Sequence, residues 1–516
     1  MTSVATATDL FARLEVEGAR YVHWKSNEHL AAALAGETDL DVLFDRRQYG
    51  LVRRVLDECG YRPFRTTDLS GYPGIEDHFA LDPGTGRLVH CHAHFLLSAG
   101  RRYLKGHRIP WEDLFLATAV RDPSSGVWIA DADLEFLALL VRAAMKLRTR
   151  NRVGALLGRQ AFRGGMVDEY EWLLLRLDQG KTVELARSQL GANAAGVVEG
   201  MLESPPGDAD LRRLRRASKS TVDEWRTHRG FSASREAWRR EIHAIRTALN
   251  RRSLQRAVPG RRVIPGGGIL VAFIGSDGSG KSTVVEAVTS QLARKVDVLR
   301  VYMGSGDGPV SLLRSPLRPL ARAVDRMRGP DHGDPPRPES TERDPGEHDS
   351  REIESSDRDP TRRDPAPILV GRVLWALTLA REKRQRLETA WRARNRGLIV
   401  ITDRFPQAQI AGFNDGPLLR KRAETGGSLL RRAAAIEEKT YLLARRQPPD
   451  LVVRLRITPE IAVARKPEMS KSEVARRDAA IGSMTWPEET RVIDVDASQP
   501  LEDVLREVLV AIWGEI

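Results

Sequence analysis

The chain has 516 residues, which is too long for one hydrophobic core, so we expect two or three domains. Hydrophobic residues make up 41% of the chain, which supports globular folding, and the formal net charge is +12. A basic balance suits nucleic acid or phosphorylated small molecules, but the chain has no aromatic-plus-basic RNA motif, zinc-finger spacing or recognition helix, which disfavours nucleic acid as a partner.

Cysteine content and the apolar stretches indicate the compartment. Two cysteines, Cys59 and Cys91, exclude an extensive disulfide framework and suit a reducing cytosol, so we expect a cytoplasmic protein. Residues 1–20 lack a basic start and carry three acidic residues, which is not typical of a signal peptide. The longest apolar stretch, near residues 134–145, is too short to span a bilayer. A homodimer is compatible with the sequence.

Three regions differ in composition and in their predicted secondary structure, and these differences predict the domain organisation. Residues 1–125 alternate short strand-like runs with turns, and residues 126–258 are polar and helical with leucine-rich faces. A linker rich in proline, glycine and arginine opens the third region, residues 259–516. Within it, residues 329–367 are almost all charged, proline, serine or histidine. This insert cannot bury enough apolar surface to fold, so we expect it to be disordered, as a tolerated loop extension or a tether.

The most specific motif is residues 275–283, which read GSDGSGKST after the apolar run 269–274. A glycine, four residues and then Gly-Lys-Ser form a phosphate-binding loop, in which glycines let successive N–H groups point at a phosphate. Lys281 reaches the outer phosphates and the Ser282 hydroxyl binds magnesium. Residues 284–288 look helical and add the positive end of a helix dipole. The motif predicts ATP and Mg²⁺ as cofactors, with the binding residues Gly275, Gly278, Gly280, Lys281, Ser282 and Thr283.

A second constellation follows the strand-like run 398–402. An acidic residue such as Asp403, at the carboxyl end of a neighbouring parallel strand, holds magnesium directly or through water, or takes a proton from an acceptor. Arg404 beside it has the planar fork that clamps phosphate oxygens. A capped turn is the alternative interpretation of this pair.

Basic segments lie on either side of this strand. A helix is expected over residues 368–395, followed later by a strand over 449–457 and a helix that leads to Arg465 and Lys466. Arg465 and Lys466, together with residues 471–477, form a predicted basic flap that closes on transferring phosphates and excludes water. An ordinary charged helix–loop–helix is the alternative interpretation. The first helix carries Arg381, Lys383, Arg384 and Arg386.

Residues 269–516 resemble the thymidylate kinase family of P-loop nucleoside-monophosphate kinases. The resemblance implies a P-loop kinase with a parallel sheet flanked by helices, and ATP- and Mg²⁺-dependent phosphoryl transfer to a nucleoside monophosphate, first of all dTMP to dTDP. It rests on the loop 275–283 with Asp277, the triplet Asp403-Arg404-Phe405, the strand after Pro449-Asp450 with Arg465-Lys466 beyond it, and the closing run Val492-Ile493-Asp494.

The same resemblance implies roles for individual residues. Lys281 and Ser282 would hold ATP phosphates and magnesium, and Asp277 would lie near the acceptor sugar. Arg404 would bridge the donor and acceptor phosphates, and Arg381 falls close to where the family places a monophosphate-binding arginine. The expected catalytic residues are Lys281, Asp403, Arg404 and Asp277, the acceptor-binding residues are Asp277, Arg381 and Phe405, the lid residues are Arg465 and Lys466, and the metal ligands are Ser282 and Asp403.

The acceptor stays open between several classes. Residues 406–417 do not match the segment with which the family encloses the thymine base, so another phosphorylated or hydroxylated metabolite is an alternative acceptor. A phosphate acceptor needs no general base, whereas a hydroxyl acceptor makes Asp277 or Asp403 the candidate base. Two further alternatives are a kinase of another metabolite that acts with an N-terminal nucleotidyltransferase, and a nucleotide-sensing regulatory protein without turnover.

The N-terminal region carries a shorter motif. Asp39 and Asp41 alternate on a strand-like run and therefore project to the same side, where paired carboxylates can hold magnesium for nucleotidyl transfer. Lys25 and Ser26 form a turn before that run. The pattern resembles polymerase-beta-type nucleotidyltransferases, which implies an α+β nucleotidyltransferase-like domain over residues 1–125 with a phosphate-binding turn at Lys25-Ser26. A solubilising aspartate pair is the alternative.

A third carboxylate, which such a site normally has, is not evident in the sequence. Instead His90, His92 and His94 alternate on an otherwise apolar run and would share one face. They are candidates for binding metal or phosphate, or a histidine cluster without a ligand. A degenerate, nucleotide-binding or regulatory role for this domain is therefore as well supported as turnover.

Overall fold

The computed structural model describes residues 2–67, 71–101, 104–147, 162–227, 231–254, 258–304, 366–410, 415–467 and 469–516. The chain divides into two compact units, residues 1–255 with 260–265, called the N-terminal unit, and residues 256–259 with 266–516, called the C-terminal unit. Both contain helices and strands, which confirms the prediction of a mixed α/β chain. The predicted insert 329–367 lies outside the described residues, except where helix α16 begins at Ala366. Within the described part, none of the helices combines the length and apolarity that crossing a bilayer requires.

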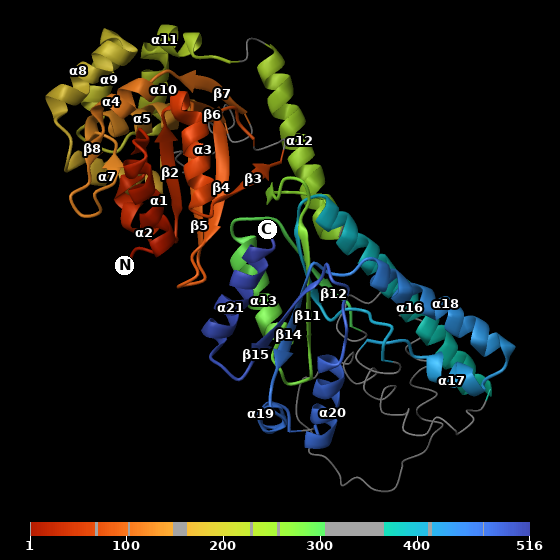
Figure 1. The fold of residues 1–516 in the computed structure, drawn as a ribbon. Coiled ribbons are helices and arrows are strands. Elements are labelled where there is room, and N and C mark those ends of the chain that lie inside the picture. The colour runs from red at the N-terminus through yellow and green to blue at the C-terminus, as the bar shows by residue number, and fades with distance from the viewer. Residues whose placement is uncertain are drawn as a thin grey trace. The chain divides into compact units, whose positions relative to one another are not determined.

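The C-terminal unit is built on a five-stranded sheet in which all neighbouring strands are parallel, in the order β12-β13-β11-β14-β15. Every residue of β11 from Ile269 to Ile274 is buried, as expected for a strand that is covered on both faces of the sheet. Helices α13 and α21 lie side by side on one face, and α16 lies on the other, with α18 packed along α16 (Figure 1). The strands are β11 (Ile269–Gly275), β12 (Val298–Tyr302), β13 (Ile399–Asp403), β14 (Leu451–Arg456) and β15 (Arg491–Asp496). The helices are α13 (Lys281–Ala293), α16 (Ala366–Asn395), α17 (Arg420–Thr425), α18 (Ser428–Arg446), α19 (Pro459–Arg465), α20 (Lys471–Gly482) and α21 (Leu501–Gly514).

The register of this sheet decides where its loops meet. Phe273 of β11 pairs with Asp403 of β13, and Gly275 pairs with Leu455 of β14. Parallel strands end at the same edge, so the phosphate-binding loop after β11 and the residues after β13 come together there. This edge is where open α/β sheets bind ligands.

The N-terminal unit contains a mixed eight-stranded sheet in the order β10-β3-β4-β5-β2-β1-β9-β8 and a separate two-stranded sheet, β6-β7. The pairs β2/β5 and β1/β9 are parallel, and the other pairs of the large sheet are antiparallel. The strands are β1 (Tyr21–His23), β2 (Asp39–Phe44), β3 (Arg62–Thr66), β4 (Ile75–Leu81), β5 (Leu88–His94), β6 (Leu97–Arg101), β7 (Leu104–Ile109), β8 (Val120–Arg121), β9 (Trp128–Ile129) and β10 (Arg262–Val263).

Two hydrophobic cores cover the two faces of this sheet. One lies under α1 (Ala5–Val16), α2 (Leu30–Leu34) and α3 (Tyr49–Glu58). The other is centred on α5 (Ala132–Lys146), which is buried along most of its length and packs with the helices that follow it. Strands and later helices therefore share one core. The remaining helices are α4 (Glu112–Thr118), α7 (Gly165–Leu174), α8 (Gln179–Leu190), α9 (Ala192–Gly200), α10 (Asp208–Ala217), α11 (Lys219–Glu224) and α12 (Phe231–Leu254), with 3-10 turns η1 (Asn27–His29) and η2 (Arg46–Gln48).

Candidate functional site

The phosphate-binding loop joins β11 to α13 and is shaped by its glycines. Gly278 and Gly280 have φ angles of 85° and 80°, a region that favours glycine. A Cβ at Gly275 would lie 2.7 Å from the Ser279 hydroxyl and 2.8 Å from the Leu455 carbonyl oxygen, so only glycine fits there. Lys281 is buried, and its ammonium donates to the carbonyl oxygens of Gly275 (2.9 Å) and Ser276 (2.8 Å). These contacts hold the ammonium inside the loop.

Two hydroxyls of the loop make no hydrogen bond to any residue that the structure describes. The side-chain oxygens of Ser276 and Ser279 are buried, and neither makes a hydrogen bond within the described residues. A buried hydroxyl without a partner costs free energy, and it is a donor available to a phosphate oxygen. Together with the start of α13, whose N-terminal N–H groups favour anions, the donor set of the loop fits a nucleotide phosphate chain.

Ser282 and Asp403 meet at the edge of the sheet. The Ser282 hydroxyl donates to Asp403 Oδ2 at 3.0 Å, and Asp403 is buried at the end of β13. A hydroxyl and a carboxylate are the oxygen ligands that Mg²⁺ prefers. The two predicted metal ligands therefore lie together, and their chemistry fits that ion.

Asp277, at the centre of the loop, gathers cations from three segments. Its carboxylate accepts from Arg404 Nη2 at 3.1 Å and from Arg477 Nη1 at 2.9 Å, and Lys281 Nζ lies 3.8 Å away. Burial alone would raise the pKa of Asp277, but Lys281, Arg404 and Arg477 outweigh it and hold that pKa well below its usual range. Arg404 adopts a φ of 69°, the left-handed region, so its position is held against its own backbone preference.

The predicted lid is the pair of helices α19 and α20. Arg465, at the end of α19, donates to the Ala497 carbonyl oxygen at 3.1 Å, and its guanidinium lies beside Gly280. Lys466 is near enough to Asp277 to lower the pKa of that carboxyl. The buried lid arginine is Arg477 of α20, which bonds both Asp277 and Glu473.

Arg381 of α16 is exposed, whereas two other basic residues of this helix contact residues near this edge of the sheet. Lys383 is buried and pairs with Asp415 at 3.2 Å, and Arg386 donates to the Tyr302 carbonyl oxygen at 2.9 Å. A helix turns about 100° per residue, so residues 383 and 386 lie on the same side of α16 and residue 381 lies on a different side. Phe405 is buried and packs edge-on against Trp486, with ring centroids 6.0 Å apart.

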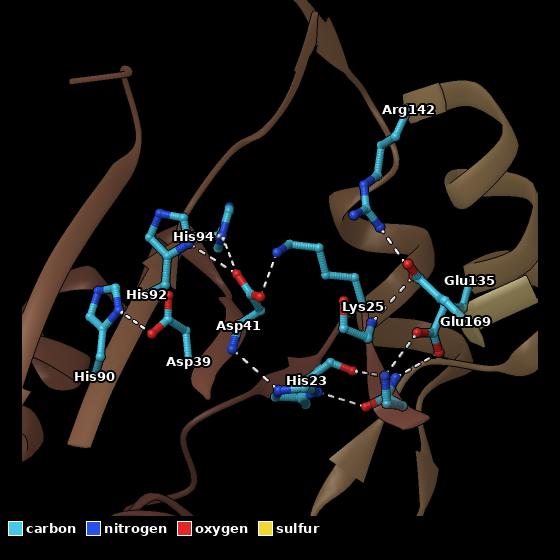
Figure 2. A network of polar contacts seen from close by, with 12 residues as sticks. His23, Lys25, Asp39, Asp41, His90, His92, His94, Glu135, Arg142 and Glu169 are labelled. Carbon is cyan, nitrogen blue, oxygen red and sulfur yellow. Dashed lines mark hydrogen bonds and ion pairs between the residues drawn. The ribbon is translucent and has the colours of Figure 1, made fainter. Parts of the chain in front are cut away.

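In the N-terminal unit, strand alternation puts the aspartates and histidines on one face. The odd-numbered residues Asp39 and Asp41 of β2 face away from the core under α1 and α3, and the parallel register pairs them with His90 and His92 of β5. Figure 2 shows the aspartates and the three histidines pointing toward one another. The residues of the two strands that fill the opposite core are Leu40, Val42, Phe44, Val89, Cys91 and Ala93.

Asp39 and Asp41 have different partners. His90 Nδ1 lies 2.9 Å from Asp39 Oδ1, and its Nε2 lies 2.8 Å from Asp77. Asp41 Oδ1 lies 2.9 Å from His92 Nδ1 and 3.4 Å from His94 Nε2, while its second oxygen contacts Lys25. The two predicted aspartates therefore contact different histidines: Asp39 contacts His90, and Asp41 contacts His92 and His94.

Ionisation states follow from these contacts. Burial raises the pKa of Asp41, but Lys25 and the two imidazoles outweigh it, so the pKa lies well below the usual range. Burial lowers the pKa of His92 and, more strongly, of His94. At neutral pH the cluster therefore holds one carboxylate and two neutral imidazoles.

The turn at Lys25 and Ser26 is stabilised by hydrogen bonds to helices that come more than 100 residues later in the chain. The Asn27 amide side chain donates to Glu135 Oε2 of α5 at 2.6 Å, and the Ser26 backbone N–H donates to Glu169 of α7 at 3.4 Å. Arg142 of α5 pairs with Glu169 at 3.3 Å, as Figure 2 shows. Sequence reasoning missed Glu135, although a glutamate inside the apolar run 134–140 was a usable signal.

Comparison with known proteins gives distant relatives. No protein-family model matches the chain. A protein of Escherichia coli (strain K12) named "Uncharacterized ATP-binding protein YghS" is 26% identical over 253 residues, which cover 48% of this chain and 93% of that protein. The protein of the same strain named "Uncharacterized ATP-binding protein YghR" is 26% identical over 267 residues, 49% of this chain and 89% of that protein. The similarity thus spans nearly all of each relative and about half of this chain.

The buried carboxyl of Glu135 should make the stability of the fold depend on pH. Burial, with the repulsion of Glu169, raises the pKa of Glu135 to about 8. The unfolded chain ionises this group near its ordinary pKa while the folded chain keeps it protonated, so stability present at pH 4 is lost as pH rises to 8, by an amount on the order of a few kcal/mol. Urea unfolding of Glu135→Gln should show a smaller loss between pH 5 and pH 8. The control is exposed Glu171→Gln on α7, and equal pH dependence of the two variants would contradict the prediction.

Proposed function

We propose that the C-terminal unit binds ATP and transfers its outer phosphoryl group to a small acceptor, with Mg²⁺ as cofactor. The observation that carries the proposal is the meeting of Lys281, the Ser282–Asp403 pair and two arginines around one phosphate-binding loop. The names of the relatives, which are ATP-binding proteins, support the nucleotide part. The thymidylate kinase resemblance supports a nucleoside monophosphate as acceptor, with dTMP first.

Charge neutralisation supplies most of the catalysis in such a reaction. The bond from the outer phosphorus to the bridging oxygen of ADP breaks as the acceptor oxygen bonds to the same phosphorus. Lys281 lies inside the loop that would hold the outer phosphates, and Asp277 holds Arg404 and Arg477 over it. Ser282 and Asp403 would hold Mg²⁺, which neutralises phosphate charge when bound.

Asp277 is poorly suited to be a general base. Its pKa lies far below neutrality, and three cations occupy its oxygens, so it would accept a proton weakly. This favours an acceptor that is already anionic, such as a phosphate monoester, over a neutral hydroxyl. Asp403 remains the base candidate if the acceptor is a hydroxyl.

The test is release of ADP from ATP and Mg²⁺ with a panel of nucleoside monophosphates and sugars, with mass spectrometry of the product. We expect stimulation by one class of acceptor and a product heavier by one phosphoryl group. Addition of a nucleotide instead would favour an enzyme that couples the kinase to an N-terminal nucleotidyltransferase. ATP binding in calorimetry without turnover on any acceptor would refute phosphoryl transfer and favour a nucleotide sensor.

A further inference from the structure

The cluster of Asp41, His92 and His94 has the geometry of a three-ligand metal site. The three donor atoms lie 2.9, 3.2 and 3.4 Å from one another, and all three belong to a single group that could hold one ion. Ligands about 2.0–2.2 Å from a tetrahedral Zn²⁺ lie roughly 3.3–3.6 Å apart, so small shifts would place an ion between them. Two residues come from β5 and one from β2, which the parallel register of the two strands holds side by side.

The ring nitrogens of His92 and His94 approach the same Asp41 oxygen and stand 3.2 Å from each other. Each imidazole can present a lone pair at that nitrogen in one of its two tautomers. A cation at the centre would then be met by two imidazole lone pairs and one carboxylate oxygen.

The donor set selects the kind of metal. Two imidazole nitrogens with one carboxylate suit Zn²⁺, Co²⁺ or Fe²⁺, whereas Mg²⁺ prefers oxygen ligands. Three protein ligands leave at least one coordination position open, which is typical of catalytic rather than structural zinc sites. His92 is the least buried of the three, with 20% of its side chain exposed, so it marks the open side.

Cations surround the same site. Lys25 contacts the free oxygen of Asp41. The Trp24 ring packs edge-on against His94, with ring centroids 5.2 Å apart. The Lys25 ammonium lies 5.5 Å and the Arg142 guanidinium 5.3 Å from the centroid of the same Trp24 ring. Lys25 and Arg142 thus place two cations beside the cluster, where they would favour an anionic ligand.

We propose that Asp41, His92 and His94 bind one divalent transition-metal ion, and that its open position takes a phosphoryl group steered by Lys25 and Arg142. This site belongs to the N-terminal unit and is independent of the phosphoryl transfer proposed for the C-terminal unit. The ligand class is a phosphorylated small molecule, recognised by metal coordination and by the lysine and arginine charges.

Cobalt binding tests the metal. The full chain, freed of metal and kept in excess Mg²⁺ so that oxygen-only sites are filled, is titrated with Co²⁺ and followed by its visible d–d absorption. We expect one Co²⁺ per chain, displaced by Zn²⁺. Loss of a second-shell partner costs about 10–100-fold in metal affinity, so loss of a ligand in His92→Ala or His94→Ala should cost at least about 100-fold. His29→Ala, an exposed histidine of the same unit, is the matched control.

A measurement on the unmodified chain guards against variants that fail to fold. X-ray absorption of the Zn²⁺-loaded protein should show two imidazole ligands and oxygen ligands. Sulfur ligation, no imidazole, no Co²⁺ uptake, or unchanged Co²⁺ affinity in folded His92→Ala and His94→Ala would each overturn the metal site.

Inorganic phosphate probes the open position. Phosphate should shift the Co²⁺ spectrum of the unmodified chain, and Arg142→Ala should weaken the phosphate effect at unchanged Co²⁺ affinity. A Co²⁺ spectrum that phosphate leaves unaltered would overturn the phosphoryl part of the proposal. Phosphate acting equally on Arg142→Ala would remove Arg142 from the site.

Discussion

Lys281→Ala is expected to slow phosphoryl transfer strongly, because it removes the one buried cation inside the phosphate-binding loop. Removal of one preorganised charge donor lowers kcat by on the order of 10²–10³-fold. Burial lowers the pKa of Lys281 to about 8, with Asp277 acting in the opposite direction, and bound phosphates would favour its charged form further. Steady-state ADP release with the best acceptor measures the effect.

Binding and chemistry are separated by calorimetry with ATP. A lysine that serves mainly the transition state lowers kcat more than it weakens ATP binding. Lys439→Ala, which alters an exposed lysine on α18 of the same unit, is the matched control and should behave as the unmodified chain. Activity of Lys281→Ala within a factor of two of that control would contradict both this prediction and the proposed phosphoryl transfer.

Asp403→Asn is expected to raise the Mg²⁺ concentration needed for activity and to lower kcat by about 10²-fold. The substitution keeps the size of the side chain and its hydrogen bond with Ser282, but it removes the negative charge that Mg²⁺ would meet at the end of β13. Mg²⁺ titrations of ADP release are the measurement.

Asp496→Asn is the matched control, because Asp496 also ends a strand of the same sheet but is exposed. It should leave the Mg²⁺ dependence unchanged. An unaltered Mg²⁺ requirement in Asp403→Asn would show that the buried carboxylate serves the fold and not the cofactor. If kcat fell and the Mg²⁺ requirement did not, Asp403 would act on the acceptor, as a base for a hydroxyl.

Local patterns of the chain predicted a good deal of the C-terminal site. The loop 275–283 is contiguous, and glycine, lysine and serine at that spacing have one common structural use. Asp403 and Arg404 could be placed beside it because a buried strand ends there, and parallel strands end at a common edge. Arg381 was chosen by resemblance and stays a prediction, whereas the structure shows contacts of Lys383 with Asp415 and of Arg386 with Tyr302, which the sequence pattern did not single out.

The N-terminal unit shows where pattern reasoning stops. Alternation along a strand predicted that Asp39 and Asp41 share a side and that the three histidines share a side. It carries no information on which strands are neighbours. That β2 lies parallel to β5, with Asp41 opposite His92, follows from the packing of both strands under α1 and α3.

Local sequence was therefore enough to predict the phosphate-binding loop, the mixed α/β character and the side on which each charged residue of a strand projects, because these depend on neighbours within a few residues. The three-dimensional packing sets which basic residue of α16 is buried, which histidines meet Asp41, and that Glu135 supports the turn at Asn27 from 108 residues away. The physical reason is that such contacts depend on helix phase and strand order, which the burial of apolar faces across the whole unit sets.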